Sequence, residues 1–147
     1  MFTLGIRTLP VIVLVGLTAI TAAEEPSEWS GQAGPGRPVV TVARDQVGLH
    51  WLRRAFGLPD SFPKVDFGTH IVVGIGLGMR PTGGYGVTIL DCESRAGTLS
   101  VRYTVQTPGG RIVTQALTAP FQVKILPCAA SGSVMLRAVE NPEDRAE

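Results

Sequence analysis

The sequence predicts a β-dominated α+β fold, either an antiparallel sheet or a sandwich, covered by one helix. Three observations lead to this prediction. From residue 70 onward, apolar residues recur at every second position, as in strands with one buried face. A single segment before residue 58 has helical spacing instead. Gly and Pro residues separate several short runs, which favours antiparallel strands over a repeated β-α-β array.

Residues 1–23 have the pattern of a secretory signal peptide. A single arginine is their only charge, an apolar run extends from Leu9 to Ile20, and Thr21 and Ala23 are small residues before a cleavage point at Glu24. The apolar run is shorter than the roughly 20 residues that a membrane-spanning helix needs. We therefore expect a secreted or periplasmic protein with no membrane span after signal cleavage.

Composition divides the rest of the chain into three parts. Residues 24–37 are rich in Gly, Pro and polar residues, which predicts a flexible leader. Residues 38–140 hold the predicted helix and strands, and we assign them to one β-rich domain. Residues 141–147 are charged and lack an apolar run, which predicts a flexible tail.

The domain is expected to begin with a short strand and the helix. The run from Val39 to Ala43 is mostly β-branched, which predicts a strand. Asp45 stands at an N-cap position, and Gly57 is expected to end a helix from Gln46 to Phe56. We expect this helix to pack mainly through Trp51, Leu52 and Phe56, on an apolar face formed by Val47, Trp51, Leu52, Ala55 and Phe56.

The other strands follow an irregular connection from Leu58 to Phe67. In the run from His70 to Leu77, alternate residues form one apolar face, while Gly74 and Gly76 leave the other face nearly bare. A bare face allows a ring or another backbone to approach closely. Further strands are expected at residues 86–90, 99–106, 121–125 and 134–140.

A Pro and Gly loop joins two of these runs. Its sequence is Gly78-Met79-Arg80-Pro81-Thr82-Gly83-Gly84-Tyr85. Pro81 fixes φ near −65°, and Gly83 and Gly84 permit positive φ, which predicts a shaped hairpin connection. Tyr and Arg are residue types that recur as interface anchors. We therefore predict an exposed recognition edge with these partner-binding residues: Arg80, Pro81, Thr82, Gly83, Gly84, Tyr85, Pro120 and Phe121.

Two plainer interpretations of these residues remain open. The loop is a mere turn in the first. In the second, Tyr85 and Phe121 are core residues at strand ends, because both begin alternating runs with apolar partners.

Charge and motifs narrow the class of function. The chain has 13 Lys plus Arg and 12 Asp plus Glu, so no basic excess predicts binding to nucleic acid or to a membrane surface. We expect the partner to be another exported protein, with a protease as a candidate. No Ser, Thr or Cys stands in a recognisable nucleophile motif, which predicts a non-catalytic protein.

The two cysteines, Cys92 and Cys128, lie in the exported part of the chain. An oxidising compartment allows them to form a disulfide, and two unpaired buried thiols are the alternative. A disulfide between the ends of two strands would exclude these strands as in-register antiparallel neighbours. Neither His50 nor His70 has ligand spacing with the cysteines, so we expect no metal and no cofactor.

The ordered motifs resemble those of the PrcB C-terminal domain family, over about residues 65–127. The resemblance implies that residues 38–140 are a PrcB-like domain of an exported accessory subunit, which stabilises or helps assemble a surface protease complex. Phe121 stands where the family often has Tyr, and the cysteine pair departs from its pattern. The motifs are Val65-Asp66-Phe67, Ile71-Val72-Val73, the loop from Gly78 to Tyr85, and the segment from Thr114 to Ile125.

Three segments are also similar to the inhibitory loops of chagasin-type cysteine protease inhibitors. Those proteins are immunoglobulin-like sandwiches whose loops cluster at one end. Gly83 stands where that family usually has Thr, and the third segment lacks the expected Arg before its Pro. The resemblance implies an inhibitor as an alternative function, and a lipocalin-like small-ligand or lipid-binding cavity is another. The segments are Arg80 to Tyr85, Pro108-Gly109-Gly110 and Ala119-Pro120-Phe121.

Overall fold

The computed structural model describes residues 27–129 and 132–141. The signal peptide expected at residues 1–23 and most of the tail expected at 141–147 lie outside the described residues. The elements, in chain order, are β1 (Glu28–Gly31), β2 (Pro38–Ala43), α1 (Gln46–Phe56), β3 (Ile71–Leu77), β4 (Gly86–Arg95), β5 (Thr98–Gln106), β6 (Phe121–Leu126) and β7 (Ser133–Ala138).

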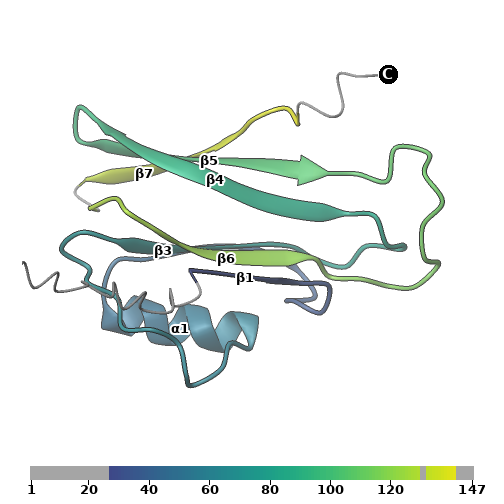
Figure 1. Ribbon diagram of the computed structural model, residues 1–147, viewed down its shortest axis with the longest axis horizontal. Coiled ribbons are helices and arrows are strands. Elements are labelled where there is room, and N and C mark those ends of the chain that lie inside the picture. Colours follow the sequence, from purple (N-terminus) through teal and green to yellow (C-terminus); the bar gives the residue numbers. More distant parts are fainter. Residues whose placement is uncertain (1–26, 130–131, 142–147) are drawn as a thin grey trace, which may run out of the picture.

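The strands form two sheets that face each other, with α1 on the outer side of one sheet (Figure 1). The first sheet has the order β1-β6-β3-β2, and the second has the order β4-β5-β7. Strand pairs are antiparallel except for β5 and β7, which run parallel. The predicted β-dominated α+β fold with one covering helix is therefore confirmed, and the parallel β7 makes the second sheet a mixed one.

β3 is the centre of the fold, because every one of its residues is buried. On the side facing the second sheet, Ile71, Val73 and Ile75 pack in one cluster with Leu99 and Val101 of β5. These are the apolar positions that the alternation predicted. In the described part of the chain, such side chains fill the space between the sheets that a lipocalin-like cavity would need.

The other side of β3 receives a ring from the helix. A Cβ built on Gly74 would lie 2.5 Å from Cε2 of Phe56, so glycine is what lets this ring approach. The expectation that a bare strand face admits a ring is thus confirmed. Phe56 also lies against Phe121 of β6, with ring centroids 5.7 Å apart. One side chain therefore attaches α1 to two strands of the first sheet.

The helix begins and ends where the sequence predicts, because both caps are local. The Asp45 carboxylate accepts a hydrogen bond from the Gly48 amide at 2.7 Å. Gly57 adopts the left-handed conformation with φ of 62° and ends the helix. No helix within the described residues is long and apolar enough to cross a membrane.

The buried face of α1 differs from the predicted one. Leu49, Leu52 and Phe56 are buried, three and four residues apart. Val47 and Trp51 are 67% and 60% exposed. The prediction that Trp51 packs on the sheet was therefore wrong, because the helix is rotated to place Phe56 on the bare face of β3.

β1 lies within the segment that was expected to be a flexible leader. It pairs antiparallel with β6, from Glu28 opposite Lys124 to Gly31 opposite Phe121. Trp29 stacks on Phe62 of the irregular connection, with ring centroids 4.2 Å apart. The leader prediction is wrong for this strand, because one aromatic anchor and the open edge of β6 compensate for the surrounding Gly and Pro residues.

The disulfide between Cys92 and Cys128 is present, with Cα atoms 6.4 Å apart. Cys92 lies inside β4, and Cys128 follows the end of β6. Since these strands belong to different sheets, the bond connects the two layers of the sandwich. They are not neighbours in one sheet, as the sequence argument required of paired cysteines.

Candidate protein-binding site

The loop of residues 78–85 crosses from one sheet to the other. β3 belongs to the first sheet and β4 to the second, so the prediction of a hairpin connection was wrong. The loop pairs instead with residues 107–120, which join β5 to β6. Arg80 exchanges two backbone hydrogen bonds with Thr118, of 2.7 and 3.0 Å. We call residues 78–85 and 107–120 together the loop end, which lies at the right of Figure 1.

Gly84 allows the two segments of the loop end to approach closely. Its φ is +83°, and a Cβ on it would lie 2.6 Å from Cγ1 of Val113 and 3.1 Å from Cβ of Pro108. Gly83 is not among the described glycines with positive φ, so that expectation was wrong for Gly83. Its amide serves the contact differently, by donating to the Thr114 carbonyl at 2.8 Å.

Arg80 and Tyr85 lie together, as the sequence predicted for a recognition loop. The guanidinium carbon of Arg80 is 5.4 Å from the centre of the Tyr85 ring, which is a cation–π contact. Nε of Arg80 is buried without a hydrogen-bond partner in the described part of the chain. The Tyr85 ring is half-buried and packs against the core between the sheets. The pair is therefore a fixed feature of the surface.

Pro120 and Phe121 lie beside this loop, but they are not an exposed edge. Pro120 is fully buried, and its carbonyl accepts a hydrogen bond from the Leu77 amide at 3.0 Å. Phe121 is half-buried, and a Cβ on Gly34 would lie 2.7 Å from its Cδ1. The predicted exposure was therefore wrong for Pro120, whose side chain is inaccessible to a partner. Phe121 offers part of its ring.

Sequence reasoning missed the exposed apolar side chains of the loop end. Met79, Ile112 and Leu117 are 56%, 105% and 69% exposed. In the bridge between Arg80 and Thr118, Met79 precedes one partner and Leu117 precedes the other, so both lie on the face opposite the bridging pair. Exposed apolar side chains that gather in this way mark interaction surfaces. The available signal was large aliphatic residues inside segments with no strand period.

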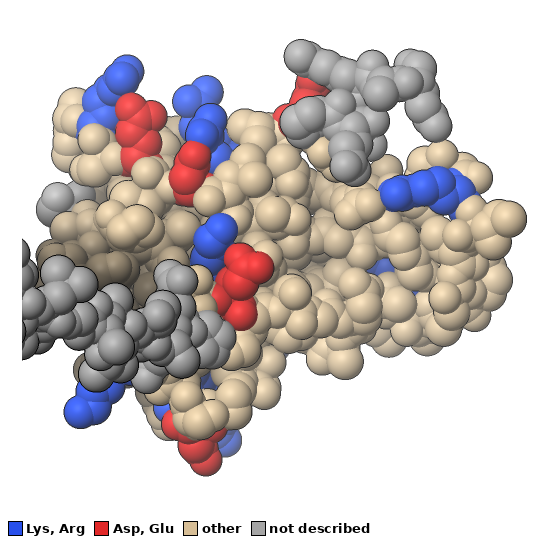
Figure 2. Space-filling view, viewed as in Figure 1, with Lys and Arg blue, Asp and Glu red and all other residues tan. Residues whose placement is uncertain are grey.

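The loop end carries basic charges and no acidic ones. Residues 67–90 and 94–139 contain no Asp or Glu. Arg80 and Arg111 lie in the two segments, and Arg37 precedes β2 at the same end, because Pro38 pairs with Leu77. Figure 2 shows basic and no acidic side chains at the right-hand end of the face that it presents. This charge suits a partner surface with carboxylates.

A cleft of about 270 Å³ adjoins the loop end and lies between the edges of β1 and β4. Ser30 and Gly31 line one side, and Gly86 to Thr88 line the other. Tyr85 and Phe121 both contribute to its wall. The structure thus brings together two of the side chains that the sequence analysis proposed as partner-binding residues.

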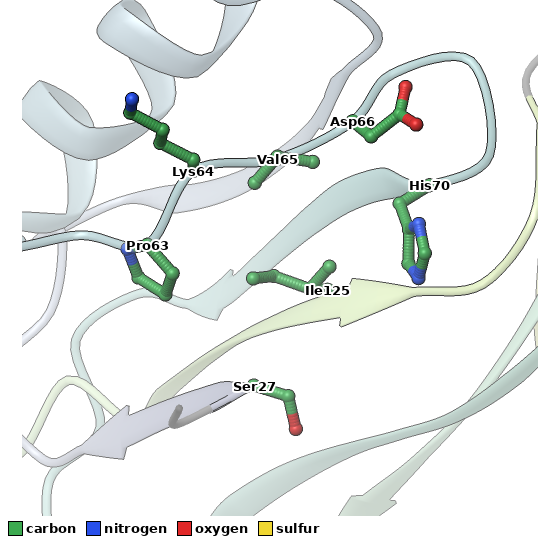
Figure 3. Close-up of a pocket in the computed structure, with 7 residues that line it drawn as sticks. All are labelled: Ser27, Pro63, Lys64, Val65, Asp66, His70 and Ile125. Atoms are coloured by element: carbon green, nitrogen blue, oxygen red, sulfur yellow. The ribbon is translucent and has the colours of Figure 1, made fainter. Parts of the chain in front are cut away.

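A second hollow of about 270 Å³ lies at the other end of β3 (Figure 3). Figure 3 shows the side chains of Lys64 and Asp66 directed away from Ile125. Asp66 accepts a hydrogen bond from the Gly68 amide at 2.9 Å, and Nδ1 of His70 is 2.7 Å from the Thr69 hydroxyl. These titratable groups hold their own loop and do not converge on one point, so the hollow offers no assembled catalytic group.

A wider hollow of about 490 Å³ lies beside the disulfide and shares His70 with the second one. Asp91 on its wall accepts a hydrogen bond from Nε of Arg102 at 2.6 Å. This bond lowers the pKa of Asp91 from its ordinary value and raises the pKa of Arg102. Among the residues that the structure describes, no three His, Cys, Asp or Glu side chains gather to hold a metal ion.

Comparison with known proteins identifies the family of the central strands. Residues 71–127 match the model of the family described as PrcB C-terminal, which confirms the resemblance inferred from the motifs. The match runs from β3 through β6 and contains the entire loop end.

The chain is also similar to secretory-abundant heat soluble protein 33020 from a species of Hypsibius. The two are 35% identical over 65 residues, which cover 43% of this chain and 39% of that protein. The similarity thus spans less than half of either protein. No solved structure matches this chain significantly.

Proposed function

We propose that this chain, whose residues 71–127 match the PrcB C-terminal family, is an exported, non-catalytic module that binds another exported protein. Its proposed role is to stabilise or help assemble a protease complex of the cell envelope or surface. The signal-peptide pattern of residues 1–23 supports export to the periplasm or beyond. The family match supports the association with a protease complex.

The loop end is the observation that carries this proposal. Its side chains stand on two segments that are fixed to each other before a partner arrives, by the backbone bonds of Arg80 and Gly83. A fixed loop loses less conformational entropy on binding than a mobile one. Met79 and Leu117 supply exposed apolar area, and the Arg80–Tyr85 pair supplies the residue types of interface anchors.

Capture of a partner from the organism's envelope fraction tests the proposal. The bait is the mature chain, residues 24–147, and a co-purifying protease is the expected result. Arg80→Ala and Leu117→Ser should each weaken capture by at least about 1 kcal/mol, or roughly fivefold. Both variants should fold, because Arg80 joins the loops through its main chain and Leu117 is exposed.

Arg95→Ala is the matched control for these variants. Arg95 is exposed at the end of β4, away from the loop end, and its ion pair is with Glu93 of the same strand. Its loss should leave capture unchanged. Equal capture by the loop-end variants and this control would remove the loop end from the binding surface.

A second candidate function is inhibition of a papain-like protease. The observation that favours it is the sandwich itself, in which Pro108 lies against Gly84 and two of the three chagasin-like segments meet at one end. Burial of Ala119 and Pro120 in the third segment argues against it. Assay of papain with the mature chain decides between them, since an accessory module should leave its activity unchanged at micromolar concentration.

A further inference from the structure

β4 is an edge strand, and part of its free edge is covered by side chains of the other sheet. The Ile89 amide donates to the side-chain oxygen of Gln122, and the Ile89 carbonyl accepts from Nζ of Lys124 at 3.2 Å. Both side chains come from β6. Free edges invite pairing with other chains, and proteins commonly block them. The edge is therefore blocked at Ile89.

The same hydrogen bonds show that the edge is open at Val87. Because the Ile89 amide bonds to Gln122, Ile89 and its partner Tyr103 form a pair without ladder hydrogen bonds. Such pairs alternate along an antiparallel ladder, so Val87 and Val105 form another. The amide and carbonyl of Val87 thus point away from β5. Within the described residues, neither group has a hydrogen-bond partner.

The edge of β1 is open in the same way. The Ile125 amide donates to the Ser27 carbonyl at 2.8 Å, which begins the ladder between β1 and β6. Three residues further along, Ser30 falls on a pair without ladder hydrogen bonds, opposite Gln122. Its amide and carbonyl point away from β6, and the described part of the chain offers them no partner.

Ser30 and Val87 line the same cleft. We propose that this cleft receives an extended segment of the partner protein, inserted as a strand between β1 and β4. Successive residues of an extended chain direct their backbone groups to opposite sides, so such a segment can bond to both edges. Tyr85 and Phe121 then contact its side chains. This inference rests on the proposed function and names the part of the partner that is recognised.

A short partner segment fits this cleft better than a second copy of the chain. Another copy would pair strand to strand along β4, and the side chains of Gln122 and Lys124 block that pairing from Ile89 onward. Only the first part of β4 is open, and β1 itself has four residues. Both edges therefore suit a segment of a few residues.

A synthetic peptide tests the inference without knowledge of the partner. The probe is a capped hexapeptide of alternating threonine and valine that ends in glutamate, followed by NMR on the mature chain. The amide signals of Ser30 and Val87 should shift, with a Kd below about 1 mM. Two further peptides, N-methylated at the odd or at the even residues, should each bind at least tenfold more weakly. Absence of any shift, or equal binding of the methylated peptides, would overturn the inference.

Variants of β1 provide the matched control. Ser30→Pro removes the amide that points into the cleft and breaks no ladder bond, so the fold should persist. It should weaken peptide binding at least tenfold, whereas Ser30→Val keeps the amide and should bind normally. Equal binding by both variants, or concentration-dependent dimers with protected Ser30 and Val87 amides, would contradict insertion of a partner segment.

The outcomes separate this inference from the proposed function. If Arg80→Ala loses the captured partner while Ser30→Pro keeps it fully, the loop end binds and strand insertion is wrong. If the peptides bind as expected but no partner is captured, the cleft is supported and the accessory function fails.

Discussion

Gly74→Ala tests whether the fold depends on the close contact between α1 and β3. The added Cβ would lie 2.5 Å from Cε2 and 2.9 Å from Cζ of Phe56. Those distances are shorter than van der Waals contact, so the ring has to move. Phe56 is 5% exposed and packs against Phe121, which leaves it little free space. The helix must therefore shift away from the sheet.

The expected loss of stability follows from two opposing terms. Overpacking of a close-packed core costs about 1–3 kcal/mol. Replacing glycine by alanine restricts the unfolded chain, which returns about 0.4–1 kcal/mol. The net loss for Gly74→Ala is therefore about 1–2 kcal/mol. At Gly76 the added Cβ would lie 3.4 Å from Phe56 and 3.5 Å from Pro35, so Gly76→Ala should be neutral or slightly stabilising.

Urea unfolding of the mature chain measures both free energies. Gly74→Ala should lower the midpoint with an unchanged slope, and Gly76→Ala is the matched control. Adding Phe56→Leu should relieve the clash, so the cost of Gly74→Ala should shrink in that background. If Gly74→Ala and Gly76→Ala unfold at the same urea concentration, the ring does not lie on Gly74 and the helix placement is wrong.

Three further predictions concern the helix, the disulfide and acid stability. Trp51→Ala should cost less than about 0.5 kcal/mol and Leu52→Ala about 2–5 kcal/mol, because the first side chain is 60% exposed and the second is buried; thermal unfolding distinguishes them. Replacing Cys92 and Cys128 by Ser should destabilise by about 3–4 kcal/mol in the chain-entropy model, and reductant should lower the melting temperature of the natural chain alone. The lowered pKa of Asp91 contributes stability that is present above the ordinary value of 3.8 and is lost as pH falls through the lowered pKa. Asp91→Asn should therefore remove a small part of the acid-induced loss in a pH series of urea midpoints, and an unchanged acid profile would contradict this role.

Local signals explain what the sequence could predict about the helix. Asp45 and Gly57 specify its ends through the geometry of their own residues. The choice of buried face was not local, because Val47 and Trp51 also have helical spacing. It depends on the room beside Gly74, which only the assembled sheet defines. The rotation of the helix was thus beyond single-segment reasoning.

The same distinction applies to the candidate site. Pro81 and Gly84 determine the shape of the loop, but loop shape does not specify the next strand's partner. The sandwich, in which β3 and β4 lie in different sheets, follows from long-range pairing. Pro120 ended an alternating pattern in the sequence, so its burial under the loop end could not be foreseen. The pairing of Arg80 with Tyr85 could be, because a short loop holds both.

Tyr85 connects the two surfaces that we assign to binding. One contact of its ring is the guanidinium of Arg80 in the loop end, and the same residue forms part of the cleft wall. Directly after it, β4 begins with the open edge at Val87, and the edge is blocked two residues later by Gln122 and Lys124. The unblocked part of β4 therefore coincides with the part nearest the arginines. A partner with an acidic, extended segment could contact both surfaces at once, and the two contacts would then reinforce each other through effective concentration.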